Sequence, residues 1–411
     1  MTANPPGRRG FLRAGATTAA ALIAWTRARA DAPPAIPSEM QEQGAPLLSP
    51  PYGQPSPFER NVIRRVRVMP SIPSVGSSLS PLADLHGIIT PGGLHYERHH
   101  AGVPHIDPAQ HRLLVHGLVE RPLLFTMDDI TRFPSVSRIH FLECSGNTPF
   151  WGGVSPALSV QQSHGLLSCS EWTGVRLTDL LGEVGLLPQA KWMLAEGGDA
   201  AAMTRSIPIE KVLDDAMLAY AQNGEHLRSE QGYPLRLVLP GFEGNTNIKW
   251  LRRLKFGDQP WETREETSKY TDLLPDNKAR QFAFVMEVKS VITEPSGGRT
   301  LTRPGFREIR GLAWSGHGRI ARVEVSADSG GTWHDAQLQE PVLPKCLTRF
   351  RLPWSWSGQP AVLSSRATDE AGNVQPTHDA LLAVRGNRGG YHYNAVHSWR
   401  VANDGSITGA A

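Results

Sequence analysis

Between residues 141 and 147 the chain reads Phe141-Leu142-Glu143-Cys144-Ser145-Gly146-Asn147. The apolar start is typical of a strand and Ser-Gly-Asn is typical of a turn, so Cys144 is expected where a strand meets a loop. A single cysteine is most often a small buried apolar residue. Functional side chains nevertheless concentrate at such junctions, and the Ser-Gly-Asn backbone offers N–H groups that can stabilise a thiolate. The residues alone leave both interpretations open.

The other two cysteines have different surroundings. Cys169 follows an apolar run and precedes Trp172, so we expect it to be structural. Cys346 lies in a later, strand-rich part of the chain and is expected to be structural or a disulfide partner. Three cysteines are too few for a disulfide-built scaffold and allow at most one intrachain bridge.

Basic side chains gather upstream of this stretch. The run Tyr96-Glu97-Arg98-His99-His100 concentrates one guanidinium and two imidazoles, with His95 and His105 close by. A zinc site is one interpretation, but adjacent histidines rarely bind one ion, and no Cys or carboxylate stands at the spacing of zinc ligands. Anion binding by Arg98 with His100 fits better, because a guanidinium fork matches an oxyanion.

A second basic feature lies downstream. Arg236 stands inside the apolar run 234–241, and Lys249 precedes Trp250 nine residues past Pro240. A charge within such a run must be paired or must bind an anion, because burying it alone is too costly. An internal salt bridge and an anion site both remain open on this pattern.

From about residue 85 to 275 the periodicity is mixed. Short apolar strands are predicted at 112–116 and 235–239, and short helices at 126–130 and 177–184. The first helix has capping-box spacing between Thr126 and Asp129. No Gly-rich phosphate loop follows a strand. The pattern indicates an α+β domain rather than regular βαβ units.

Beyond Phe282 the periodicity changes to two. Strands are predicted at 320–326, 350–352 and 361–367, with turns about every ten residues. Short strands at this spacing indicate an immunoglobulin-like β-sandwich.

The composition is close to that of soluble globular proteins with more than one domain. The 411 residues are 40% hydrophobic and 20% charged, and no run of eighteen apolar residues occurs, so no membrane-spanning helix is expected. The net charge of +3 depends on five arginines in residues 1–30; without them, 37 basic residues face 39 acidic ones. No basic tract of the kind that binds nucleic acid remains.

Residues 1–30 have the features of an export signal. Arg8-Arg9 is followed by Phe11-Leu12 and an alanine-rich apolar run, and Ala28-Arg29-Ala30 has the small-x-small pattern of a cleavage site. An ordinary secretory signal or a basic amphipathic helix is the alternative. The arginines beyond the apolar run favour the twin-arginine route, so we expect a periplasmic protein that is exported folded.

Over roughly residues 85–401 the chain resembles the sulfite oxidase family of molybdopterin enzymes. Four segments carry the resemblance in the family's order and approximate spacing, at 96–104, 144–147, 165–177 and 232–251. Segments 292–295 and 314–316 also resemble the family's C-terminal dimerisation domain. The resemblance implies an α+β molybdopterin-binding (sulfite oxidase) fold followed by an immunoglobulin-like β-sandwich.

The composition and the resemblance together predict that the chain has four parts. They are a twin-arginine signal peptide at 1–30, an extended Pro/Ser/Gly-rich arm at 31–80, a molybdopterin-binding catalytic domain at 81–280 and an immunoglobulin-like dimerisation domain at 281–411. The last part implies a homodimer.

The resemblance also implies roles for single residues. Cys144 matches the family's thiolate ligand to molybdenum, and a thiolate is a soft donor suited to such a metal. Arg98 and Tyr270 match catalytic positions, and Arg400 lies near a second substrate arginine. The matches to pterin-binding positions are Tyr96, His99, His100, Asp199, Gln231, Arg236, Asn247, Ile248 and Lys249. Among these, the two cations Arg236 and Lys249 are suited to the pterin phosphate.

The sequence departs from the usual sulfite oxidase pattern at two places. Thr148-Pro149 stand where basic residues are usual, and Gln231 replaces a pterin-binding histidine. The first change removes positive charge beside the metal and weakens the case for free dianionic sulfite. Together with the leader, the sequence looks like the molybdenum subunit of periplasmic sulfane dehydrogenases in thiosulfate-oxidising systems, whose substrate is sulfane sulfur on a cysteine of a carrier protein.

A molybdenum oxidoreductase of this kind must pass on its electrons. The sequence contains no Cys-x-x-Cys-His for a covalent haem, so a c-type cytochrome subunit is the expected acceptor. Two alternatives stay open: a dehydrogenase of free sulfite, and a non-enzymatic exported binding protein in which Cys144 is merely buried.

The leader generates a direct prediction. Replacing Arg8-Arg9 with Lys-Lys should leave cofactor-loaded precursor in the cytoplasm, because a receptor reads the arginine pair rather than its charge. Cell fractionation with an activity assay measures this, and normal periplasmic activity of the variant would refute the twin-arginine assignment.

Overall fold

The computed structural model describes residues 40–41 and 52–410. The expected signal peptide at 1–30 lies outside these residues, as does most of the first half of the expected arm. The chain divides into two units between Arg60 and Asn61. In the first unit, the 3₁₀ helix η2 (Pro57–Glu59) is capped by the Ser56 side chain, which accepts a hydrogen bond from the Phe58 N–H. The second unit, Asn61–Ala411, contains the sheets and α-helices of the described residues.

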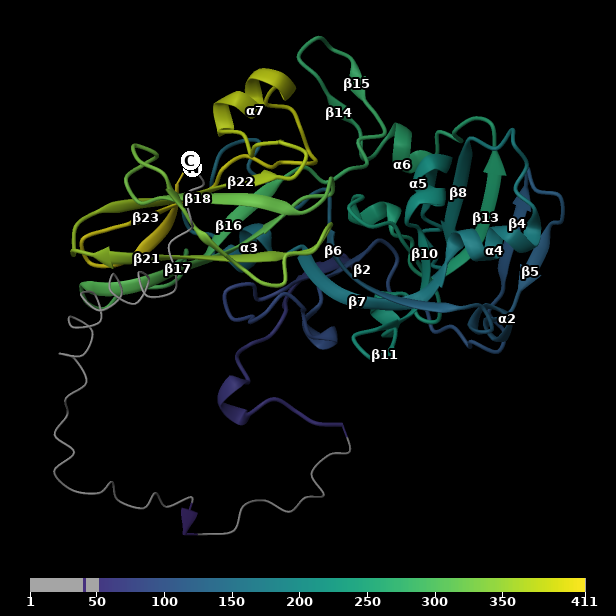
Figure 1. The fold of residues 1–411 in the computed structure, drawn as a ribbon, viewed down its shortest axis with the longest axis horizontal. Coiled ribbons are helices and arrows are strands. Elements are labelled where there is room, and N and C mark those ends of the chain that lie inside the picture. The colour runs from purple at the N-terminus through teal and green to yellow at the C-terminus, as the bar shows by residue number, and fades with distance from the viewer. Residues whose placement is uncertain (1–39, 42–51, 411) are drawn as a thin grey trace, which may run out of the picture. The chain divides into compact units, whose positions relative to one another are not determined.

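Two sheets, the first antiparallel and the second mixed, build the half of this unit that corresponds to the predicted α+β domain (Figure 1). The order of the first is β11(Glu225–His226), β10(Met217–Gln222), β7(Leu167–Arg176), β6(Ser135–Glu143), with β12(Arg236–Val238) paired to β10. The order of the second is β5(Leu123–Phe125), β4(Leu113–Gly117), β13(Leu251–Gly257), β8(Trp192–Gly197), β9(Thr204–Pro208). Only β4 and β13 run parallel within this second sheet, and one apolar core fills the space between the sheets and their helices.

The C-terminal half is the predicted β-sandwich. One sheet has the order β16(Lys289–Glu294), β17(Gly305–Trp314), β21(Thr348–Trp356), β20(Gln337–Gln339). The other has the order β19(His334–Asp335), β18(Ile320–Ser326), β22(Ala361–Asp369), β23(Ser398–Val401), β24(Ile407–Ala410). The bounds of β18 equal those predicted from the period-two alternation, because Val323 and Val325 face the core while Arg322 is exposed.

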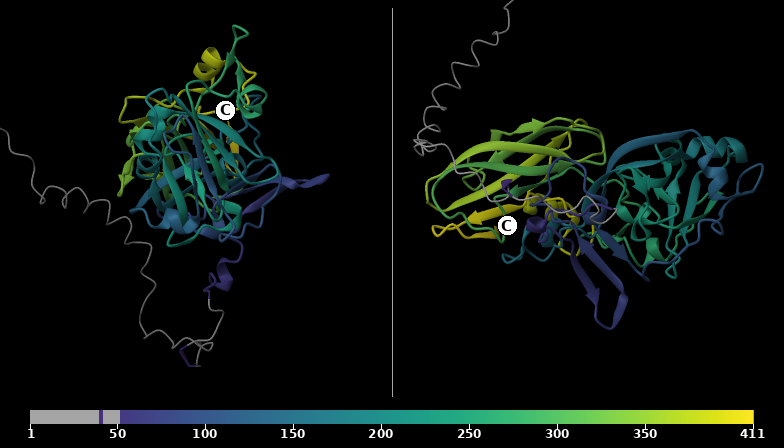
Figure 2. Two further views of the ribbon diagram at one scale, coloured as in Figure 1. Left: turned by 90° about the vertical axis from the view of Figure 1, so that its right-hand side faces the viewer. Right: turned by 90° about the horizontal axis from the view of Figure 1, so that it is seen from below.

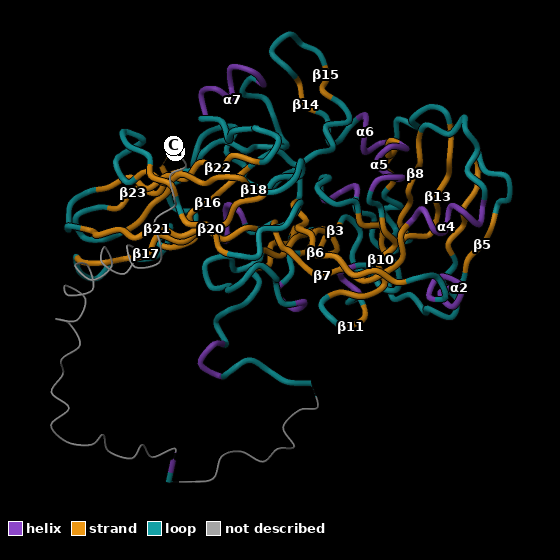
Figure 3. Tube along the Cα trace, in the orientation of Figure 1, coloured by secondary structure: helices purple, strands orange, loops and turns teal. Residues whose placement is uncertain are grey.

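Helices are few and short (Figure 3). The α-helices are α2(Met127–Thr131), α3(Val160–His164), α4(Leu177–Val184), α5(Ile209–Asp214), α6(Arg264–Thr267) and α7(His378–Arg385), and the 3₁₀ helices of this unit are η3(Gly92–Leu94), η4(Ser229–Gln231) and η5(Gly244–Thr246). The predicted capping box of α2 is present, with the Thr126 and Asp129 side chains each accepting from the other's N–H. Helix α4 buries four side chains at helical spacing and ends at Gly185, whose φ of 68° suits glycine.

A hairpin occupies the end of the expected arm. Strands β1(Arg65–Met69) and β2(Ile72–Leu79) pair antiparallel, β2 pairs with β3(Glu97–His99), and the hairpin extends away from the other sheets (Figure 2). The alternation of Arg and Val in β1 supplies the strand periodicity, which the proline-rich context obscures in the sequence. A separate two-stranded ribbon joins β14(Asp272–Leu273) to β15(Ala279–Arg280). Among the described residues, no helix has the length and apolarity needed to cross a membrane.

A single hydrophobic core crosses the boundary between the two halves. It combines Phe141, Val160 and Leu167 of the first half with side chains of both sandwich sheets, including Trp314 and Trp399. The two halves are therefore packed together as one interior rather than joined by a linker.

A buried ion pair lies inside this shared core. Glu143, at the end of β6, accepts hydrogen bonds from Lys289 Nζ at 2.9 Å, Asn147 Nδ2 at 2.9 Å and Trp314 Nε1 at 2.6 Å. The exposed fractions of Glu143 and Lys289 are 0% and 2%. Lys289 also donates to Thr148 Oγ1 at 2.6 Å, so the sandwich holds both flanks of Cys144. Burial lowers the pKa of Lys289, and the Glu143 charge opposes this shift.

Removing the cation of this pair should destabilise the whole chain. In Lys289→Met the Glu143 carboxylate stays buried without its counter-charge, and the free energy of unfolding should fall by about 3–5 kcal/mol. Lys278→Met is the matched control, because that exposed lysine pairs with Asp276 at the surface and its loss should cost less than about 1 kcal/mol. Urea unfolding of both variants measures the difference, and equal effects would contradict a structural role for the buried pair.

Candidate functional site

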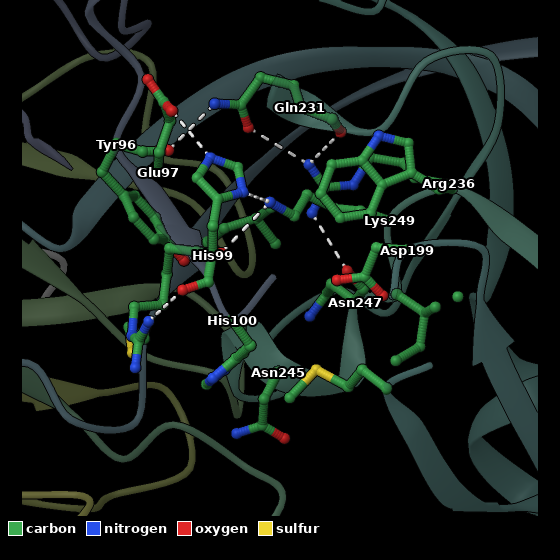
Figure 4. A pocket seen from close by; sticks show the side chains of 18 of the residues that line it. Tyr96, Glu97, His99, His100, Asp199, Gln231, Arg236, Asn245, Asn247 and Lys249 are labelled. Atoms are coloured by element: carbon green, nitrogen blue, oxygen red, sulfur yellow. Dashed lines mark hydrogen bonds and ion pairs between the residues drawn. The ribbon is translucent and has the colours of Figure 1, made fainter. Parts of the chain in front are cut away.

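One pocket brings together twelve of the thirteen residues for which the resemblance implies a role (Figure 4). They are Tyr96, Arg98, His99, His100, Cys144, Asp199, Gln231, Arg236, Asn247, Ile248, Lys249 and Tyr270. These side chains come from β3 and the two residues that flank it, from the loops after β6, β8 and α6, and from the segment that begins with η4 and ends before β13. The fold thus places segments up to about 170 residues apart around one cavity.

The first part of the pocket, which we call the cationic group, consists of the cations Arg236 and Lys249 together with the neighbouring His99. Arg236 is buried and donates to the carbonyl oxygens of Gln231 at 2.9 Å and Asn247 at 3.2 Å. Its Nε has no hydrogen-bond partner, and among the described residues it forms no ion pair. The sequence left open whether an internal salt bridge neutralises Arg236, and the described part of the chain provides none. Burial lowers the pKa of Arg236 to about 10.

Lys249 shares this lack of an anionic partner. Its Nζ donates to His99 Nδ1 at 2.8 Å and to the carbonyl oxygens of Arg98 and Glu230, each at 3.2 Å. Burial and the nearby Arg236 charge lower its pKa well below the usual value for lysine. Two cations held close together without a carboxylate create a site for a multiply charged anion such as a phosphate.

His99 is held in one tautomer between a cation and a carboxylate. Its Nε2 donates to Glu97 Oε2 at 2.8 Å while its Nδ1 accepts from Lys249. Burial and the Lys249 charge lower the pKa of His99 to about 3, so the ring is neutral at pH 7. The other carboxylate oxygen of Glu97 binds Arg64. The histidines of this segment therefore take separate partners and do not converge on a common point.

The second part of the pocket, which we call the cysteine group, contains Cys144, Arg98, His100 and Tyr270. Burial raises the pKa of the Cys144 thiol, and the Gly146 N–H and the Arg98 charge oppose this rise. A thiolate here therefore calls for a compensating cation such as a metal ion. Tyr270 Oη lies 3.3 Å from His100 Nε2, and burial lowers the pKa of His100 to about 4 and raises that of Tyr270.

Arg98 faces the pocket with unused donors. It donates only to the backbone carbonyls of Gly76 and His99, and among the described residues it has no carboxylate partner. A salt bridge to Glu97 would have made Arg98 a purely structural residue, but Glu97 is engaged by Arg64 and His99. The guanidinium is thus available to an anionic ligand.

The remaining lining residues supply polar atoms and close backbone approaches. Gln231 donates from Nε2 to the Tyr96 carbonyl at 3.0 Å, and Asp199 Oδ1 is a buried acceptor without a partner. A Cβ added at Gly244 would lie 2.7 Å from Tyr96 Oη and 2.9 Å from the Glu143 carbonyl oxygen, so only glycine fits beside the Cys144 loop. Orphaned donors, an orphaned acceptor and a thiol in one cavity fit a large anionic cofactor with a metal.

The sequence did not predict a layer of buried residues behind the cysteine group. Arg205 donates to Glu243 at 2.9 Å and lies 5.2 Å from the centre of the Tyr270 ring, and Asn245 donates to Ser145 Oγ at 3.1 Å. In the C-terminal half, His392 Nε2 lies 3.1 Å from Glu243 Oε2, and the His392 backbone N–H donates to the Ser145 carbonyl at 2.8 Å. Only the Gly-Asn-Thr-Asn run at 244–247 signals this layer in the sequence; the contacts of His392 depend on the tertiary fold.

Arg400 is the expected site residue that the structure does not bring to this pocket. It is exposed on β23, where the alternation of a strand turns Trp399 and Val401 into the sandwich core and Arg400 outward. It lines a separate hollow with residues such as Asp328 and Asp404. The structure therefore places Arg400 outside this pocket, and its expected role in substrate binding stays a prediction.

Both halves of the chain match models of known protein families. The family model described as "Oxidoreductase molybdopterin binding domain" matches residues 100–265, and that described as "Mo-co oxidoreductase dimerisation domain" matches residues 280–399. Among solved structures, the sulfane dehydrogenase SoxCD from Paracoccus pantotrophus is 46% identical, with a TM-score of 0.88, over 92% of this chain and 97% of that chain.

Two curated relatives have lower sequence identity to this chain. The mitochondrial sulfite oxidase of Drosophila melanogaster is 32% identical over 70% of this chain and 55% of its own length. An NADH nitrate reductase of Ulva prolifera is 30% identical over 73% of this chain and 39% of its own length. The chain thus spans about half the length, or less, of these two curated relatives.

The unpaired cations lead to a prediction about cofactor retention. In Lys249→Met, molybdenum and pterin per chain should fall at least about tenfold, because a charge-assisted contact to an anion is lost. The melting temperature of the cofactor-free chain should fall by at most about 2 °C, since Lys249 neutralises no carboxylate there.

Lys191→Met, which changes an exposed lysine of the same half, should alter neither quantity. Metal analysis, pterin fluorescence and calorimetry provide the measurements. Full cofactor loading of Lys249→Met would exclude Lys249 as an anion contact.

Proposed function

Because the chain belongs to the sulfite oxidase family of molybdopterin oxidoreductases, we propose that it oxidises sulfane sulfur carried on a cysteine of another protein. The similarity to the sulfane dehydrogenase from Paracoccus pantotrophus is the observation that carries this proposal, because it extends over nearly the whole of both chains at 46% identity. The sulfite oxidases and nitrate reductases lie near 30% identity.

The two groups of the pocket would bind different parts of the cofactor. Arg236 and Lys249 would bind the pterin phosphate, since both lack an anionic partner in the described chain. Cys144 would provide the thiolate ligand to molybdenum. When bound, the cofactor supplies oxygen-atom transfer and two-electron redox chemistry, while the chain fixes its coordination and orients the substrate.

Arg98 would hold the anionic end of the substrate. Its fork has donors free toward the pocket, and Tyr270 and His100 lie in the same group. His100 stays neutral at pH 7, so Arg98 is the charged substrate anchor of this group. Thr148 and Pro149 stand where the usual sulfite oxidases have basic residues, and the Thr148 hydroxyl accepts a hydrogen bond from Lys289, so neither residue adds a cation to this group. One positive charge suits a singly charged persulfide better than dianionic sulfite.

The chain would work with partner proteins outside the cytoplasm. A c-type cytochrome is the proposed electron acceptor, because the sequence has no haem attachment motif of its own. The leader supports the periplasm as the location, and the match of residues 280–399 to a dimerisation domain supports a homodimer.

An assay on two substrates tests the proposed function. With the loaded enzyme and a cytochrome acceptor, kcat/KM per molybdenum should be at least about tenfold higher for a persulfide-loaded carrier protein than for sulfite, a difference of roughly 1.4 kcal/mol. A preference for sulfite would support a sulfite dehydrogenase instead. Purified protein without molybdenum would point to a binding protein.

Cys144→Ser tests the ligand assignment. Serine is nearly the same size but a much harder and less acidic donor, so turnover should fall below about a tenth of wild type while the melting temperature of the cofactor-free chain changes little. Activity per chain, molybdenum content and calorimetry measure this. A variant that keeps more activity would refute Cys144 as the ligand.

Arg98→Met tests how the substrate is held. Loss of a charge-assisted bond should lower kcat/KM by roughly 10–150-fold at unchanged molybdenum content, and Arg98→Lys should recover only part of it because lysine lacks the planar fork. The measurement is kcat/KM per molybdenum beside the melting temperature. An unchanged value per molybdenum would reject Arg98 as a substrate contact.

A further inference from the structure

Two cysteines meet at the boundary between the α+β half and the sandwich. The Sγ atoms of Cys169 and Cys346 lie 3.3 Å apart, although 177 residues separate them in the chain. Both are present as free thiols, with exposed fractions of 0% and 1%. The two sulfurs need to approach by only about 1.2 Å to reach the length of a disulfide bond.

Specific contacts, rather than loose packing, hold the two thiols together. Cys169 lies on β7 opposite Phe141 of β6, and the Phe141 N–H donates to the carbonyl oxygen of Lys345 at 3.2 Å. Lys345 Nζ also binds Asp215 of the α+β half at 2.5 Å. The residue that precedes Cys346 is therefore tied to the strand that pairs with Cys169.

Neither thiol belongs to the pocket, and neither has a role in the proposed reaction. Both lie in the apolar core that the two halves share. From this geometry we propose that Cys169 and Cys346 form a disulfide that joins the catalytic half covalently to the β-sandwich.

The bond requires an external oxidant. The Cys169 and Cys346 thiols together lose two protons and two electrons, and one S–S bond forms. The oxidant is the disulfide of a thiol–disulfide oxidoreductase or of oxidised glutathione, whose S–S bond breaks to give two thiols. Because both sulfurs are shielded once the halves have closed, and the chain is expected to be exported folded, the exchange takes place in the oxidising periplasm while a local opening moves residues 345–347 away from β6.

The disulfide would have two consequences. It would close a loop of more than 170 residues, which restricts the unfolded chain and stabilises the folded one. It would also leave Cys144 as the single free thiol of the chain. No other cysteine could then bind the cofactor or form a wrong disulfide with Cys144.

Counting free thiols tests the proposal on the full, cofactor-loaded chain. Cells are quenched in acid, and the protein is then denatured and alkylated with N-ethylmaleimide at neutral pH, where thiolates react. The alkylated protein is analysed by intact mass and peptide mapping before and after reduction. We expect only Cys144 to be alkylated before reduction, and a peptide of Cys169 linked to a peptide of Cys346. Alkylation of all three cysteines without reduction, or a bond that includes Cys144, would overturn the proposal.

A pair of variants provides an independent measurement. Reduction should lower the melting temperature of the wild-type chain by about 5 °C or more, and it should have no such effect on the double variant Cys169→Ala/Cys346→Ala. Cys144→Ser is the matched control and should keep the full response to reduction. An equal response in the wild type and the double variant would also overturn the proposal, whatever the activity of the enzyme.

Discussion

The buried pair between Glu143 and Lys289 is the interaction on which the rest of the structure depends. A carboxylate without solvent is too costly to keep unless its charge and its lone pairs are satisfied, and here a lysine, an indole and an amide do so together. Lysine and indole come from the sandwich, whereas the carboxylate ends the strand that leads into Cys144. The position of Cys144 is therefore fixed by a charge balance that neither half achieves alone.

The pocket shows the opposite electrostatic arrangement. The network around Glu143 is neutralised within the protein, but Arg236, Lys249 and Arg98 have no carboxylate partner among the described residues. Cations held this close without a counter-charge lower the free energy of unfolding of the empty chain, and binding of an anion raises it again.

Much of the fold and most of the pocket could be predicted from the sequence, because those signals are local or belong to a family motif. The spacing of Leu177, Leu180 and Val184 predicts α4, and alternation predicts β18. The register of Arg400 could not be predicted, since one residue of shift in a strand reverses the side that a residue faces. The partners of Glu143 and of Cys169 were equally inaccessible, because such contacts join positions 146 and 177 residues apart.

The same long-range contacts assign the C-terminal half a part in the site itself. Its match to a dimerisation domain suggests a module whose task is assembly. Yet it supplies Lys289 and Trp314 to Glu143 and His392 to the Ser145 carbonyl, so it contacts both sides of Cys144. A catalytic half cut at residue 280 would lack these partners and would expose the apolar core that the two halves share. Both halves are therefore needed to fold the chain and to hold Cys144 in position.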